Sequence, residues 1–192
     1  KNEIVFCAAS FMTLGTGVGG GIIIDGKIYT GFNHAAGEMG HIAIHAGGES
    51  CGCGRKGCLE AYASATALIR EAKRAFQEHP DCMIRTLCEG DLNKINAKTP
   101  FDAKRAGDKI GTAIVDKYIR DLGEGIINYI NIFQPEIILL GGGVSKEGDY
   151  LLVPLREYVF QYSYGHDFLP QTKIECAMLG NDAGIIGAAM LD

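Results

Sequence analysis

The apolar positions predict strands near the start of the chain. Residues 3–14 form an apolar run typical of a strand, and a glycine-rich segment, Gly15–Gly21, follows it. Three isoleucines come next, and Asp25-Gly26 separates them from a second β-prone stretch at 27–29. Asp-Gly between two such runs is a strong hairpin signal, because glycine accepts a positive φ. We therefore expect three strands in a meander.

The clearest helical period lies at residues 108–132. Apolar residues recur there at steps of four, namely Ile110, Ile114, Tyr118, Leu122, Ile126 and Ile130. The pattern over 58–79 is also helical, and Pro80 ends it. Residues 31–58 have few periodic apolar positions and are expected to be irregular, whereas 81–107 indicate short helices and loops.

The last part of the chain alternates strands and helices. A short buried strand is expected at 136–140, and Gly141–Gly143 follows it directly. A helix is expected at 147–162, a strand at 173–179 and a final short helix at 182–191. Hairpin strands followed by this alternation predict an α/β fold, in which helices cover a mixed sheet.

Composition and charge narrow the classes of function. The 192 residues are 47% hydrophobic, which is enough for an ordinary packed core. The formal net charge is −5 without any basic run, so we expect no nucleic-acid partner. No apolar stretch reaches membrane-spanning length and no secretory signal is present, so no membrane partner is expected. Seven cysteines, an odd number, argue against a closed disulfide framework and fit a reducing cytoplasm.

Two glycine-rich segments are candidate phosphate or nucleotide sites. In Gly15–Gly21, glycines let backbone N–H groups turn toward a phosphate, and Thr16 adds a hydroxyl donor. It lacks the Gly-Lys-Ser/Thr of a Walker loop, and a strand rather than a helix follows it. The second segment, Gly141–Gly143 with Val144, stands between a buried strand and a helix, where a nucleotide can lie. The first segment could equally be a tight connection between strands, and for the second a plain strand-to-helix turn is the simpler interpretation.

Three cysteines crowd into one glycine-rich loop. Cys51, Cys53 and Cys58 fall within eight residues, and the glycines between them let the chain fold around a point. Thiolates are ligands of tetrahedral zinc, which needs a fourth ligand, and His41 and His45 are the nearby candidates. The alternative, a loop of free cysteines, is the weaker interpretation given the ligand type and spacing.

Polar residues flank the cysteines. Glu38, His41 and Glu60 offer the paired acceptors and donors that sugar hydroxyls need. The simpler interpretation is that Glu38 and Glu60 are surface acids, with Glu60 favoured by the dipole of the helix it begins. The chemistry of these residues alone leaves both interpretations open.

Taken together, these segments closely resemble the signature of the ROK family, named for repressors, open reading frames and kinases. The matching strings are Leu14–Ile23, Gly37–His41, Cys51–Glu60, Pro135–Ser145 and Gly180–Ala189. The combination of Glu-x-Gly-His with Cys-Gly-Cys-Gly-x-x-Gly-Cys is highly specific, and the resemblance spans nearly the whole chain. It implies the actin-like ATPase fold shared with hexokinases, with residues 1–192 as the C-terminal lobe of a two-lobed sugar kinase and a zinc-binding loop inserted in it.

The resemblance also implies roles for individual residues. The expected zinc ligands are His41, Cys51, Cys53 and Cys58. Such a zinc would be structural, because four protein ligands leave no open position. The residues expected to bind sugar hydroxyls are Glu38, His41 and Glu60. The expected nucleotide contacts are Gly15, Thr16, Gly17, Gly19, Gly142, Gly143 and Val144.

By the same resemblance, the parent protein is expected to be a sugar kinase of the glucokinase type. It would transfer the γ-phosphoryl group of ATP, with magnesium, to the 6-hydroxyl of glucose. A cytoplasmic homodimer acting in glycolysis is expected. The alternatives are another sugar (N-acetylglucosamine, N-acetylmannosamine, allose or fructose), polyphosphate as the donor, or the sugar-sensing lobe of a ROK repressor. The intact Gly-Thr-Gly segment favours the kinase.

One departure from the family pattern concerns catalysis. The motif Asp-x-Gly-Gly-Thr is absent. By the resemblance, the Asn-Asp pair whose Asp acts as general base also belongs upstream, and Asn181-Asp182 of the string Gly180–Ala189 is not that pair. The resemblance therefore implies no catalytic residue in this chain and a general-base Asp upstream of Lys1. The isolated 192 residues are expected to be inactive.

Overall fold

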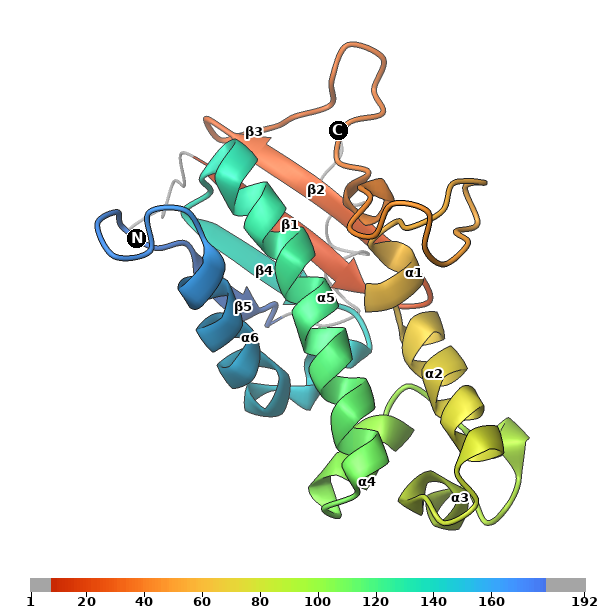
Figure 1. Ribbon diagram of the computed structural model, residues 1–192. Coiled ribbons are helices and arrows are strands. Elements are labelled where there is room, and N and C mark those ends of the chain that lie inside the picture. Colours follow the sequence, from red (N-terminus) through yellow and green to blue (C-terminus); the bar gives the residue numbers. More distant parts are fainter. Residues whose placement is uncertain (1–7, 179–192) are drawn as a thin grey trace.

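The computed structural model describes residues 8–178, and a five-stranded mixed sheet forms their centre (Figure 1). The strands are β1 (Ala8–Leu14), β2 (Val18–Ile24), β3 (Lys27–Ile28), β4 (Ile137–Gly141) and β5 (Lys173–Cys176). β2 pairs antiparallel with both β1 and β3, whereas β1 and β4, and β4 and β5, pair in parallel. The strand order β3-β2-β1-β4-β5 confirms the mixed sheet that the hairpin and the strand–helix alternation predict.

Helices cover one face of this sheet and extend beyond its end. The α-helices are α1 (Glu60–Ala63), α2 (Ala65–Glu78), α3 (Met83–Leu87), α4 (Thr99–Arg105), α5 (Lys109–Phe133) and α6 (Asp149–Tyr162). The 3₁₀ turns are η1 (Met39–His41), η2 (Leu92–Lys94) and η3 (Val144–Glu147). α5 runs across the sheet beside α6, while α2, α3 and α4 gather around the far end of α5 (Figure 1). Asp108 caps α5 by accepting the N–H of Gly111, so the helix predicted over 108–132 is confirmed.

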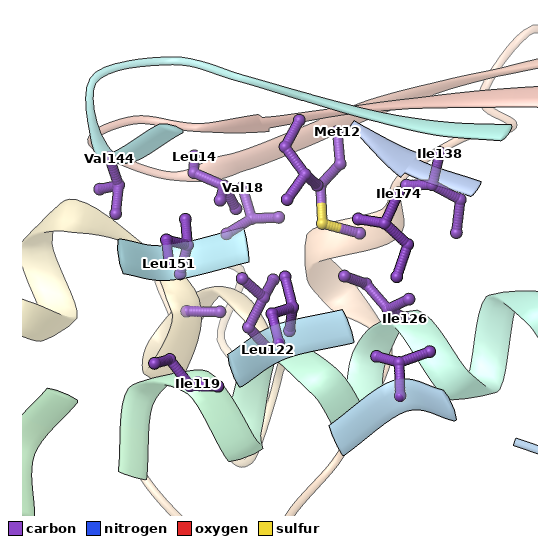
Figure 2. Close-up of a cluster of buried hydrophobic side chains, with 14 of the residues drawn as sticks. Met12, Leu14, Val18, Ile119, Leu122, Ile126, Ile138, Val144, Leu151 and Ile174 are labelled. Atoms are coloured by element: carbon purple, nitrogen blue, oxygen red, sulfur yellow. The ribbon is translucent and has the colours of Figure 1, made fainter. Parts of the chain in front are cut away.

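The core lies between the sheet and the two helices α5 and α6. Figure 2 shows Met12 and Ile138 of the sheet facing Leu122 and Ile126 of α5, with Leu151 of α6 beside them. All five side chains are buried. Each such side chain contributes about 1.5–3 kcal/mol by leaving water. The core thus fixes the strand ends, where both glycine-rich segments begin.

The loop predicted at Gly15–Gly21 is wrong from Val18 onward. These residues pair with β1 as strand β2. The glycines are needed for close packing of η1 on this strand. A Cβ on Gly20 would lie 2.3 Å from the Sδ of Met39. A Cβ on Gly40 would lie 2.2 Å from the carbonyl oxygen of Val18. This close approach seats η1, and with it His41, directly against β2.

The helix predicted over 58–79 is two helices, α1 and α2, which are separated at Ser64. Ser64 is extended, with φ −90° and ψ 164°, and its side chain accepts the N–H of Ala67, which caps α2. Thr66 Oγ1 donates to the carbonyl of Thr16 at 2.7 Å. The break therefore places the N-terminus of α2 beside the first glycine-rich segment.

The elements predicted for the last part of the chain are only partly within the described residues. The strand expected at 173–179 is present as β5, which ends at Cys176, and the helix expected at 147–162 is present as α6, which begins at Asp149 after η3. The helix predicted at 182–191 lies outside the described residues. Among the residues that the structure describes, no helix combines the length and the apolar character that crossing a membrane requires.

Candidate functional site

Three thiols and one imidazole of the cysteine-rich loop converge on one point. The ligand atoms of His41, Cys51, Cys53 and Cys58 all lie within 4.8 Å of one another. The Sγ of Cys51 is 3.6 Å from the Nδ1 of His41, and the Sγ atoms of Cys53 and Cys58 are 3.7 Å apart. Tetrahedral zinc, with bonds of about 2.0–2.3 Å, separates its ligands by roughly 3.3–3.8 Å. Both of these distances fall in that range and no pair is more than 4.8 Å apart, so a small contraction of the four side chains fits the ion expected from the sequence.

Backbone turns bring the ligands together. The N–H of Gly54 donates to the carbonyl of Cys51 at 3.0 Å, and the chain then returns through Gly57. An isolated antiparallel bridge joins Cys58 to Ala43, close to the end of η1. Gly54 and Gly57 both have φ +89°, a conformation that only glycine adopts without strain. The loop is thus a closed structure built on two glycine turns.

These two glycines differ in their surroundings, which gives a matched test. Replacing Gly54 with alanine should cost about 1–2 kcal/mol of unfolding free energy, because its Cβ meets only open space and the positive φ is the whole penalty. Replacing Gly57 with alanine should cost at least about 3 kcal/mol, because backbone displacement is added. Its Cβ would lie 1.7 Å from the carbonyl oxygen of His45. Urea denaturation of both variants measures the difference, and equal stabilities would contradict this account of the loop.

The thiols of the cluster sit in unequal environments. Burial raises the pKa of Cys51 to about 12 and also raises the pKa of Cys58. A hydrogen bond from the backbone of Arg55 lowers the pKa of Cys53. A bound cation supplies the positive charge that favours thiolates in such a place. The donor set and its spacing therefore suit a metal better than a group of free thiols.

The residues predicted to bind sugar hydroxyls surround this cluster. The Nε2 of His41 lies 3.8 Å from Oε2 of Glu38, so the second ring nitrogen faces away from the cysteines. Glu38 is 69% exposed. Glu60 is half-buried, and its Oε2 accepts the N–H of Val18 at 3.0 Å, while Oε1 lies 3.4 Å from the Sγ of Cys51. Glu60 is therefore not a solvated surface acid, whereas Glu38 is open to solvent.

A cavity of about 330 Å³ separates the first glycine-rich segment from the cysteine-rich loop at residues 42–58, which we call the metal loop. Its lining includes Thr16, Gly17, Ser50, Cys51, Glu60 and Arg70. A Cβ on Gly17 would lie 2.3 Å from Oε2 of Glu60, so glycine at this position lets the carboxylate reach the backbone. Gly15 has open space around its Cβ position, whereas the N–H of Gly19, within β2, donates to Thr13 Oγ1 at 3.2 Å. The part of this segment that lines the cavity and is not paired in the sheet therefore lies before Val18.

The second glycine-rich segment meets the first at one edge of the sheet. Gly142 has φ +84°, and a Cβ there would lie 2.6 Å from the carbonyl oxygen of Leu14 at the end of β1. Gly143 and the buried Val144 continue into a cavity of about 420 Å³. The carboxyl ends of parallel strands are where ligands of α/β folds bind. Both predicted nucleotide segments therefore share one edge.

Charged residues of α4, with Lys98 directly before the helix, complete this second cavity, and no sequence pattern indicates them. Lys98, Asp102 and Arg105 line it together with Lys146 and Glu147. Arg105 pairs with both Asp102 and Glu147 and so ties α4 to η3. Charged positions on a short helix have the same pattern as a solvated face, which is why they carry no signal of their own.

His45, the other histidine considered as a fourth ligand, lies elsewhere. Its Nε2 is 2.8 Å from Oδ1 of Asp121 on α5. Within the described residues the cluster is therefore formed with His41. A contact between residues 76 positions apart leaves no trace in local spacing.

Residues 8–192 match the model of the ROK family. The chain is 39% identical over 180 residues to a glucokinase of Thermotoga maritima, covering 94% of this chain and 56% of that protein. It is 43% identical over 188 residues to a glucokinase of Halalkalibacterium halodurans, covering 94% and 54%. A xylose repressor of Caldicellulosiruptor bescii is 32% identical over 92% of this chain and 44% of its own length. The chain thus spans about half the length of the curated relatives it matches.

A solved structure shares this fold. The crystal structure of a ROK family glucokinase from Streptomyces griseus, in complex with glucose and AMPPNP, matches with a TM-score of 0.88 at 37% sequence identity. The match covers 97% of this chain and 60% of that one. The mixed sheet and its helices therefore have the arrangement of the ROK sugar kinase fold, of the actin-like ATPase type.

Proposed function

The chain belongs to the ROK family, and from this membership we propose that its parent protein phosphorylates glucose with ATP at the 6-hydroxyl. One observation carries the proposal. Glu60 lies between the four-residue metal cluster and the first glycine-rich segment, and accepts the N–H of Val18 at 3.0 Å. A carboxylate in that place can hold a sugar hydroxyl next to a phosphate. The glucokinase relatives and the glucose-bound structural neighbour support this choice of substrate.

In this proposal the metal loop organises the sugar site. His41 gives Nδ1 to a structural zinc, together with Cys51, Cys53 and Cys58, and keeps Nε2 for a sugar hydroxyl. Such a second partner fixes the tautomer and the orientation of the ring. The carboxylates of Glu38 and Glu60 accept hydrogen bonds from sugar hydroxyls. Glu38 lies 3.8 Å from the Nε2 of His41. The zinc, when bound, supplies rigidity and no reactive position.

We place the nucleotide along the sheet edge that the two glycine-rich segments share. Gly15, Thr16 and Gly17 would face the phosphates, and Gly142, Gly143 and Val144 would form the floor beneath the rest of the nucleotide. Gly19 and Gly15 have a weaker case as N–H donors, because their N–H groups are already donated, to Thr13 Oγ1 and to the carbonyl of Gly17. Phosphoryl transfer rests on positioning and on neutralisation of charge, with magnesium accompanying ATP.

The place of this chain in its parent protein is part of the same proposal. We propose that residues 1–192 form the C-terminal lobe of a two-lobed kinase whose other lobe supplies the general-base Asp. The parent protein would act in glycolysis as a homodimer. A cytoplasmic location is consistent with the six free cysteines among the described residues.

A coupled kinase assay on the full-length protein tests the function. The expected result is ATP-dependent turnover with the highest kcat/KM for glucose in a panel with N-acetylglucosamine, N-acetylmannosamine, allose and fructose, with polyphosphate compared as donor. The 192 residues alone should show no turnover, because they lack Asp-x-Gly-Gly-Thr and because we assign the general-base Asp to the other lobe. A preference for another sugar would reassign the substrate, and no phosphorylation of any sugar would overturn the kinase.

The identity to a xylose repressor supports a second candidate, a lobe that senses sugar without phosphorylating it. A repressor would bind operator DNA through a helix-turn-helix elsewhere in the parent protein and release it on sugar binding. Sugar-dependent DNA binding without turnover would establish this alternative. The higher identity to glucokinases favours the kinase.

A further inference from the structure

A cluster of four side chains joins the metal loop to α5 outside the site described above. Its members are His45, Tyr62, Lys117 and Asp121. Asp121 has only 8% of its side chain exposed and receives two partners. The Nε2 of His45 lies 2.8 Å from Oδ1, and the Nζ of Lys117 lies 2.6 Å from Oδ2. Both carboxylate oxygens of Asp121 therefore have a partner, and the partner of Oδ1 is His45 of the metal loop.

His45 is fixed at both its backbone and its side chain. Its N–H donates to the carbonyl of Gly57 at 3.2 Å, and the N–H of Ile44 donates to the same oxygen at 2.9 Å. The ring of His45 packs edge-on against the ring of Tyr62, with centroids 4.6 Å apart. Gly57 directly precedes the ligand Cys58. The imidazole is thus the side-chain link from α5 to the backbone that holds one of the cysteines.

Tyr62 extends the same link to the other end of the loop. Its hydroxyl accepts the N–H of Glu49 at 2.6 Å, two residues before Cys51. Lys117 lies 4.8 Å from the centroid of the Tyr62 ring and so connects this ring to the Asp121 carboxylate. Irregular backbone of this kind must lose conformational entropy when it binds a metal, and prior restraint reduces that cost.

We propose that Asp121, acting through His45, is a positioning residue that holds the metal loop on α5 in its zinc-binding arrangement. The inference rests on the zinc site proposed above. The partners of the Asp121 carboxylate are His45 and Lys117, which are neither proposed metal ligands nor proposed sugar-binding residues. The action of Asp121 is to order the segment between His41 and Cys58 before the metal arrives, which raises the affinity of the loop for zinc.

Zinc affinity, measured on the intact protein by competition with a chromophoric chelator, tests the inference. His45→Ala should weaken zinc binding by about tenfold, since losing a group that orients a metal site typically costs about 10–100-fold. His45→Gln should recover much of the affinity, because its amide N–H can still donate to Asp121. Asp121→Asn should weaken binding as well, and the double variant His45→Ala/Asp121→Asn should be no weaker than His45→Ala alone.

The matched control is Asp116→Asn on the same helix. Asp116 is 43% exposed and pairs with Lys104 of α4 rather than with the loop, so zinc affinity should not change. A merely structural role for His45 would lower the stabilities of the metal-free and zinc-loaded protein equally and leave zinc affinity unaltered. Zinc affinity of His45→Ala within twofold of the unaltered protein would overturn the inference. Failure of the unaltered protein itself to bind zinc would instead overturn the zinc site, and the inference with it.

Discussion

Replacing Cys58 with serine should reduce the zinc content of the protein from about one ion per chain to nearly none. Cys58 is fully buried two residues before α1, and its Sγ lies 3.7 Å from the Sγ of Cys53 within the cluster. A hydroxyl is a poor substitute for a thiolate ligand, and binding of structural zinc contributes to folding directly, by about 10–16 kcal/mol in zinc-finger peptides. Elemental analysis after expression in metal-replete medium measures the loss, and thermal unfolding should show a large fall in Tm.

Two comparisons make this result specific to the metal. Cys88→Ser changes a buried thiol outside the cluster, and it should keep the zinc while lowering stability only moderately. Cys53→Ser, at the exposed corner of the cluster, should also lower Tm and zinc content. Retention of zinc by Cys58→Ser would show that the cluster is not the metal site.

Replacing His41 with glutamine should lower kcat/KM for glucose in the full-length protein by more than about a hundredfold. In the proposed site, the change removes a zinc ligand and a sugar contact together. Glu38→Gln and Glu60→Gln should each lower it by roughly tenfold to a hundredfold, since a hydrogen bond to a charged group contributes about 1.5–3 kcal/mol. Steady-state kinetics should be measured with zinc content determined in parallel, so that loss of metal and loss of the sugar contact are separated.

The control for these acids is Glu89→Gln. Glu89 is 75% exposed and pairs with Lys94 at the surface, so the change should alter stability and kinetics by less than about half a kcal/mol. Wild-type kinetics in both Glu38→Gln and Glu60→Gln would show that neither acid binds the sugar. Glu60→Gln should in addition raise KM for ATP, because Glu60 contacts the first glycine-rich segment.

The elements predicted most accurately are those whose pattern is long or strongly punctuated. The period of α5 persists over its 25 residues, and Asp108 begins it with a side-chain cap. The failures have local causes. β2 contains three successive glycines, whose low strand propensity is overridden by pairing with β1. The break at Ser64 lies within an unbroken helical pattern, and only its contacts with the first glycine-rich segment reveal it.

The convergence of His41 and the three cysteines was predictable because these side chains are close in sequence and chemically distinctive. The spacing of the three cysteines identifies the loop, although His41 was separated from His45 only by the family resemblance. The sequence did not predict the contact of His45 with Asp121 on α5, or the position of α4 beside the second cavity. Asp121 reads as an ordinary charged position in a helix, and nothing near Val18 indicates that Glu60 accepts its N–H.

The single hydrogen bond between Glu60 and Val18 has a thermodynamic consequence. If a sugar hydroxyl competes for Oε2, this bond weakens and the glycine backbone beside it becomes free to adjust to a phosphate. The two substrates would then bind with a coupling free energy between them, and the coupling must be reciprocal. Whatever factor the sugar imposes on the affinity for ATP, ATP must impose on the affinity for the sugar.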